Sequence, residues 1–190
     1  MPSSSVKVGV VSALVLVPLV VKAFAFTKKI SSSKDPLAVW NALQGVKFMP
    51  NQMSSWLFYI AIGIANPYSR SINYRIKELE KGKVVGTMQE ERKVRNPFRC
   101  VHAAALVLFG ETVGGLALFT HLGKKDRAIL TNINAEYIKV SRGLLTATSV
   151  VPNFHDSNPE FVVTEVVIQN AKSETVAKLA LTWKTDLKRE

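Results

Sequence analysis

The chain has 190 residues, 47% of them hydrophobic and 21% charged, which is typical of a folded protein with a sizeable core. Its single cysteine, Cys100, excludes an internal disulfide and any zinc site built from several cysteines. The three histidines are widely spaced in the chain, and we expect His121 and His155 in loops or at the surface. The sequence therefore predicts neither a metal centre nor a cofactor.

The net charge of +11 is unevenly distributed. The first 34 residues carry five lysines and no acid, which leaves 20 basic and 14 acidic side chains in the remainder. This excess suits a phosphate-bearing ligand or an anionic membrane surface, although a generally basic proteome explains it equally well. The basic residues do not gather in a stripe with interleaved aromatics, so the sequence does not favour nucleic acid as a partner.

Residues 1–34 are expected to be an N-terminal targeting or anchor segment. Residues 8–21 form an uncharged run of fourteen, whereas a membrane span needs ~20 apolar residues. Extended to 8–26 the run becomes long enough for membrane association, but it then includes Pro18 and Lys22. A mitochondrial presequence and a secretory signal cleaved near Ala25 remain alternatives. We therefore expect a membrane-associated or mitochondrial protein, with secretion not excluded.

Residues 35–66 are predicted to form a helical extension. Asp35 followed by Pro36 is a helix-start signal, and this helix is expected to reach Leu43. A second apolar helix is expected to begin at Ser54 or Ser55 and to end before Asn66-Pro67.

Residues 67–190 alternate in a way that predicts six strands and one long helix. The expected strands cover 71–78, 84–91, 127–140, 144–151, 161–169 and 176–185, and the helix covers 102–121. Apolar residues change faces near Ile138 and Val140, which suggests a bulge or bend there. Short links imply antiparallel pairing, so we predict an α+β fold in which a curved antiparallel sheet wraps around the helix.

The predicted helix carries one conspicuous carboxylate. From Ala103 to Phe119 it is apolar on every side except for Glu111, and such a helix must be buried. A buried carboxylate is poorly solvated, which raises its basicity and suits it to act as a general base or nucleophile in acyl transfer to water. Gly110, Gly114 and Gly115 would let a substrate approach Glu111, although tight packing of the helix on the sheet is an equally good explanation.

The start of the same helix offers further groups. Backbone N–H groups at His102 and Ala103 are expected to be free to stabilise an oxyanion. His102 and Glu111 are nine residues apart, which puts them about half a turn out of phase and roughly 13 Å apart along the axis. One substrate on one chain would not easily meet both, whereas two chains related by a two-fold axis could bring them together.

These residues carry a resemblance to the hotdog-fold acyl-CoA thioesterase superfamily, over roughly residues 56–184. The chain resembles the phenylacetyl-CoA type in Asn96, His102-Ala103-Ala104 and Glu111, followed by Tyr137 and Gly143. It is similar to the branch known as an uncharacterised thioesterase-like domain of the DUF4442 type. The type carries Asn, then His-Gly-Gly, then an acid nine residues after the His, with the acid across a dimer interface from the His loop.

The resemblance implies that Glu111 is the base or nucleophile, that the Ala103 N–H polarises the thioester carbonyl, and that His102 and Asn96 position the carbonyl or the water. It implies an acyl-CoA or acyl-carrier substrate and a homodimer or dimer of dimers. Lys139 and Arg142, which flank a predicted turn, are candidates for binding cofactor phosphates. Ala103 and Ala104 replace the glycines of the family and narrow the approach. A non-catalytic acyl- or lipid-binding protein on the same fold is therefore the alternative.

Overall fold

The computed structural model describes residues 35–46, 50–154, 157 and 159–188. The expectations for residues 1–34 and for His155 therefore lie outside the described residues. Within the described ranges, no helix is both long enough and apolar enough to cross a membrane. The division into segments 1–34, 35–66 and 67–190 stays a prediction.

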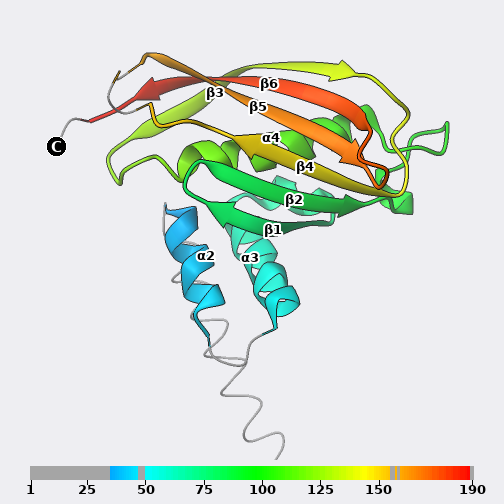
Figure 1. Cartoon of the computed structure of the whole chain (residues 1–190), viewed down its shortest axis with the longest axis horizontal. Helices are drawn as coiled ribbons and strands as arrows, with labels where there is room; N and C mark the ends of the chain where they lie inside the picture. The colour runs from blue at the N-terminus through cyan, green and yellow to red at the C-terminus, as the bar shows by residue number, and fades with distance from the viewer. Residues whose placement is uncertain (1–34, 47–49, 155–156, 158, 189–190) are drawn as a thin grey trace, which may run out of the picture.

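Six antiparallel strands form one sheet that curves around a central helix, α4, as predicted (Figure 1). Counted across the sheet, the strand order is β1-β2-β4-β5-β6-β3, so β1 and β3 are the two edges. The strands are β1 (Tyr74–Glu80), β2 (Lys83–Gln89), β3 (Arg127–Tyr137), β4 (Leu144–Val150), β5 (Phe161–Asn170) and β6 (Thr175–Asp186). The fold class and the identity of all six strands are confirmed.

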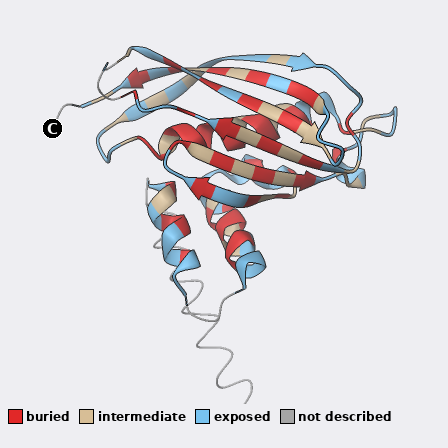
Figure 2. Cartoon of the chain, in the orientation of Figure 1, coloured by how far each residue is buried: buried red, intermediate tan, exposed pale blue. Residues whose placement is uncertain are grey.

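Helix α4 (Ala103–Phe119) fills the hollow of the sheet. Most of its side chains are buried against the strands, and Figure 2 shows the buried helix behind the sheet. Phe109, Val113 and Leu118 are inaccessible to solvent. Their burial stabilises the fold by about 2 kcal/mol each, on the usual scale for a fully buried apolar side chain. The prediction of a buried apolar helix is confirmed.

Two N-terminal helices pack beside this body. Helix α2 (Pro36–Gln44) begins as predicted, because the Asp35 side chain accepts a hydrogen bond from the Ala38 N–H at 2.9 Å. Helix α3 (Asn51–Ala65) ends where predicted but begins several residues before Ser54. The serines are not its caps, because they lie inside the helix, whose N-cap is Pro50; their hydroxyls donate to the Leu43 and Ile76 carbonyls instead.

Two local features differ from the predicted strands. The first strand begins at Tyr74 and not at Ser71, because Ser71 still belongs to a 3-10 turn, η1 (Pro67–Ser71), which starts at the proline. Strand β3 ends at Tyr137, and its register shifts earlier, between Leu130 and Asn132. Of the bulge or bend expected near Ile138, the bend is present, at Lys139 in the loop 138–143, whereas the register shift lies earlier.

His121 lies in a turn, as one of the two expected placements has it, but it is not at the surface. The side chain is buried just after α4, and its Nε2 lies 2.9 Å from the Val151 carbonyl oxygen. It packs at a ring distance of 5.3 Å from Phe154. A buried imidazole needs polar partners, and the carbonyl supplies one.

Candidate active site

The loop before α4 is built around the side chain of Asn96. Its Oδ1 accepts hydrogen bonds from the backbone N–H of Phe98 at 3.0 Å and of Cys100 at 3.2 Å, and lies 3.3 Å from the Cys100 thiol. Arg99 adopts a φ of 57°, which this tight loop requires. Asn96 therefore holds the loop in shape, and its amide nitrogen remains the group it can present to a ligand.

His102 is the N-cap of α4. Its Nδ1 accepts the Ala104 N–H at 3.0 Å, while its own backbone N–H donates to the Val94 carbonyl at 2.8 Å. The expectation that the His102 N–H is free is therefore wrong, because η2 (Arg92–Val94) supplies a carbonyl to it. The Ala103 N–H has no acceptor among the described residues, so it is the remaining oxyanion donor at this helix start.

The protonation state of the His102 ring follows from its cap. An Nδ1 that accepts a hydrogen bond carries no proton, so a neutral ring holds its proton on Nε2. Because His102 is exposed, Nε2–H is available to a ligand beside the Ala103 N–H. One imidazole can thus cap the helix with one nitrogen and donate with the other.

Glu111 lies midway along α4 on the side turned away from the sheet, and it is partly buried. It has no hydrogen bond or ion pair with any residue that the structure describes. Burial raises the pKa of this carboxyl above its usual range. Since nothing in the described fold compensates the charge, the carboxylate is costly to keep and basic when ionised.

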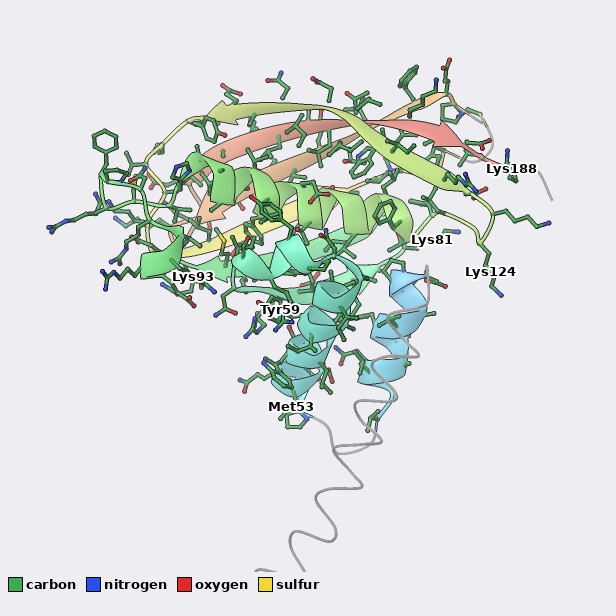
Figure 3. All side chains as sticks on the ribbon, turned by 180° about the vertical axis from the view of Figure 1, so that it is seen from behind. Met53, Tyr59, Lys81, Lys93, Lys124 and Lys188 are labelled. Carbon is green, nitrogen blue, oxygen red and sulfur yellow. The ribbon has the colours of Figure 1, made fainter. Side chains whose placement is uncertain are left out.

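A cavity of about 640 Å³ opens beside Glu111. Its walls come from α2, α3, α4 and the start of β3, all on the face seen in Figure 3, where Tyr59 marks α3 and Lys124 follows α4. The sequence patterns did not predict this cavity, because its walls come from segments that are far apart in the chain. Pro36 and Val39 of α2 are the wall residues that sequence reasoning could least have found.

Tyr74 is a second residue that the sequence patterns missed. Its side chain is fully buried at the start of β1, and its hydroxyl has no hydrogen-bond partner of ordinary geometry among the described residues. Burial, opposed by the Ser69 hydroxyl and assisted by the nearby Tyr59 and Glu111, raises the pKa of Tyr74 to about 12. Its phenol therefore stays protonated at neutral pH and lies within the electrostatic reach of Glu111.

The three glycines around Glu111 have different surroundings. A Cβ on Gly110 would lie 2.7 Å from Leu179, and one on Gly114 would lie 2.6 Å from Leu181, both on β6. These two positions support the packing interpretation of the glycines, because an added Cβ would require the neighbouring leucine side chain to move. Gly115 differs, because it also lines the cavity.

The two predicted phosphate-binding cations follow β3, at the His102 end of α4. Lys139 forms an ion pair with Glu174 at 2.7 Å, whereas the Arg142 guanidinium donates to the Phe98 carbonyl at 3.4 Å. Because the Lys139 ammonium is held in an ion pair, the Arg142 guanidinium is the more available of the two cations for a ligand.

Glu90 connects the loops on either side of the His102 end. Its carboxylate accepts the Gly143 N–H and the Arg95 Nε, each at 2.7 Å. The Gly143 N–H is the main reason why the pKa of Glu90 lies below its usual range, and Arg95 lowers it further. Lys93 marks this end of α4 in Figure 3.

The structure therefore gathers Asn96, His102, Ala103 and Arg142 at one end of α4 and leaves Glu111 apart from them. The nine-residue spacing corresponds to roughly 13 Å along the helix axis. Among the described residues, no group of three or more His, Cys, Asp or Glu side chains is placed to hold a metal ion.

The architecture is that of the hotdog fold, as solved structures show. The crystal structure of a genomics target has a TM-score of 0.67 at 23% identity, covering 79% of this chain and 99% of that one. A thioesterase from Haemophilus influenzae has a TM-score of 0.59 at 19% identity, covering 76% and 95%. A hypothetical thioesterase from Streptococcus pneumoniae, solved with coenzyme A, has a TM-score of 0.53 at 21% identity, covering 62% and 89%.

The sequence itself defines the family more narrowly. Residues 54–185 match the model of a domain of unknown function, DUF4442, and the chain belongs to that family. A Vibrio cholerae protein with the name "Putative esterase" is 28% identical over 104 residues, which cover 52% of this chain and 69% of that protein. The resemblance found in the sequence is thus confirmed for the fold and the family.

Proposed function

We propose that this protein hydrolyses an acyl-CoA-type thioester at a site shared by two copies of the chain. Glu111 of one copy acts as the base, and the start of α4 of the other copy holds the thioester carbonyl. The observation that carries the proposal is the partly buried Glu111, without a partner among the described residues, beside a cavity large enough for a ligand.

The chemistry is a hydrolysis in which every proton has an acceptor. Glu111 removes a proton from a water molecule as its oxygen attacks the thioester carbonyl carbon. The Ala103 N–H donates to the carbonyl oxygen while this oxygen carries negative charge, and His102 Nε2–H orients the same oxygen or the water. The carbon–sulfur bond then breaks, the thiolate leaves and takes the proton from Glu111, and the products are a carboxylic acid and a free thiol.

The edge strand β3 supports a two-chain arrangement. On its inner face, Ile133 and Tyr137 are 37% and 49% exposed, although their β6 neighbours in register are buried. An eleven-residue edge strand with exposed apolar side chains is a ready template for pairing with another strand. A second copy pairing along β3 about a two-fold axis would cover these residues and bring the two α4 helices closer.

The ligand class is supported by the structural relative solved with coenzyme A and by the charge around His102. We propose that Arg142 binds a phosphate of the carrier, since Lys139 is already paired with Glu174. We further propose that residues 8–26 associate with a membrane or direct the chain to mitochondria. Sequencing the N-terminus of the mature protein distinguishes an intact segment from a cleaved one.

A non-catalytic acyl- or lipid-binding protein is the second candidate. The methyl groups of Ala103 and Ala104 narrow the helix start, where the resembled enzymes carry glycines. Binding of an acyl chain in the cavity does not require access to this helix start, so the cavity alone suits either function.

The test compares the full-length protein with its Glu111→Gln and Glu165→Gln variants on acyl-CoA substrates of increasing chain length. Glu165 is an exposed glutamate on β5 and serves as the matched control. Loss of a general base is expected to lower kcat about 10²–10⁴-fold in the first variant only. Equal rates for Glu111→Gln and wild type would contradict the assignment, and binding without turnover in the wild type would favour the second candidate.

A further inference from the structure

The cavity beside Glu111 has mostly apolar walls. Two of its polar lining groups are already engaged: the Thr112 hydroxyl donates to the Leu108 carbonyl, and the Asp126 carboxylate accepts the N–H groups of Gly123 and Lys188. Asn66 and Arg127 are the other polar lining residues besides Glu111, and most of the remaining wall is apolar, including Ile62, Leu116 and Phe119. Such a wall suits an unbranched hydrocarbon chain better than a polar ligand.

Along α4 the cavity is lined by residues from Glu111 to Phe119, so Glu111 is the first α4 residue to meet it. Glu111, Gly115 and Phe119 follow one another at intervals of four residues, so they lie on the same side of the helix, and Leu122 continues this line. From Glu111 to Phe119 the helix rises by about 12 Å. An extended hydrocarbon advances about 1.3 Å per carbon, so roughly 8–12 carbons fit between Glu111 and the end of α4.

The outer wall comes from helix α2. Pro36 and Val39 are buried where they face the cavity. The helix is fixed in place by Trp40, whose ring meets that of Phe58 edge to face at 5.2 Å, and by the buried Leu43. Figure 1 shows α2 beside α3 under the same end of the sheet. Because α2 precedes residue 54, where the family match begins, this wall is an addition to the matched domain.

We propose that α2 is the specificity-determining wall of an acyl-chain pocket, and that Val39 limits the length of the chain it accepts. The inference rests on the proposed function, because it places the thioester carbonyl at Glu111 and the acyl tail toward Phe119. A medium-length saturated acyl group fills the pocket. Shorter chains leave apolar wall exposed to water, and longer chains meet α2 and the start of β3.

Two variants fill the pocket, and one control does not. Val39→Trp adds volume from α2, and Ala65→Trp adds it from the exposed end of α3, where folding is less at risk. Ala38→Trp places the same side chain on the exposed face of α2. Binding of hexanoate, decanoate and hexadecanoate to the full-length proteins is measured by calorimetry and by the shift in Tm.

The wild type is expected to bind decanoate most tightly. Each pocket-filling variant should weaken decanoate binding about tenfold or more and change hexanoate binding about twofold at most, since only the longer chain meets the new side chain. Ala38→Trp should behave as wild type. Equal chain-length profiles in all four proteins, or no fatty-acid binding by wild type, would overturn the proposal.

A parallel hydrolysis assay with hexanoyl-, decanoyl- and hexadecanoyl-CoA distinguishes a failure of the proposed function from a failure of the pocket proposal. If decanoate binds as expected but no ester is hydrolysed, the proposed function fails while the pocket stands. If the esters are hydrolysed and both tryptophan variants keep the wild-type preference for chain length, the pocket proposal fails while the function stands.

Discussion

The start and the middle of α4 differ in whether their polar groups have hydrogen-bond partners. At the start, Asn96 Oδ1 and His102 Nδ1 accept hydrogen bonds from backbone N–H groups, and the His102 Nε2–H and the Ala103 N–H are left as donors. In the middle, Glu111 has a cavity beside it but no partner among the described residues. One region is polar and organised by local hydrogen bonds, and the other is apolar and holds a costly charge. The start of α4 lacks a base, and the middle lacks a donor for an oxyanion. We therefore propose that the start of one chain and the middle of another form one site.

Separating the two chains should have the largest effect. Ile133→Lys puts a charge on the exposed inner face of β3, where it would be buried in a β3-to-β3 contact. We expect a monomer by sedimentation and a loss of thioester hydrolysis of about 10²-fold or more, as when catalytic groups are separated. Val163→Lys, on the outward face of β5, should retain both properties. An active Ile133→Lys monomer would exclude the shared site.

The two roles of the His102 ring can be tested with two substitutions. His102→Ala removes the N-cap and should lower stability by about 0.5–2 kcal/mol, together with about 10–10²-fold in kcat. Asparagine is a good N-cap but has no imidazole, so His102→Asn should recover the stability and not the activity. Recovery of both in the asparagine variant, measured by denaturation and kcat, would reduce His102 to a structural cap.

A substitution of Glu90 tests how much its hydrogen bonds stabilise the loops at the His102 end of α4. Glu90→Gln weakens the bonds to Gly143 and Arg95 and should destabilise the fold by about 1–3 kcal/mol, as for hydrogen bonds to a charged group. Because the pKa of this carboxyl is lowered in the folded state, its contribution is present above the usual glutamate pKa and is lost as pH falls through the lowered value. Denaturation of both proteins should therefore converge at acid pH; a difference that does not depend on pH would contradict this.

Glu111 should show the opposite dependence, with a smaller effect. Its raised pKa means that the folded state holds the proton more tightly, so stability falls as pH rises from the usual glutamate pKa through the raised value. Glu111→Gln removes this cost and should raise Tm at neutral pH by roughly 2–4 °C. The gain should vanish in acid, where both side chains are neutral. A gain that persists at low pH would have another cause.

Periodicity predicted the elements with local signals and missed the contacts between distant segments. The alternation of the strands and the apolar run around Glu111 identified the sheet and α4. The start of α3 was placed too late, because the helix begins directly after Pro50 and the two serines lie within it, bonded to neighbouring elements. The hydrogen bond from the His102 N–H to Val94 and the wall formed by Val39 depend on tertiary packing, which no local pattern records.

The glycines at 110 and 114 also affect the direction in which the Glu111 side chain points. An added Cβ at either position would come within 3 Å of side chains on the sheet, so the two glycines let α4 lie close to the sheet and limit its rotation about its own axis. Glu111 follows Gly110 by one position, about 100° further around the helix. The direction of its side chain therefore depends on how Gly110 packs against the sheet. Gly110 and Gly114 thus restrict the rotation of α4 about its axis. A methyl group added to either would misalign the carboxylate without altering any atom that meets the substrate.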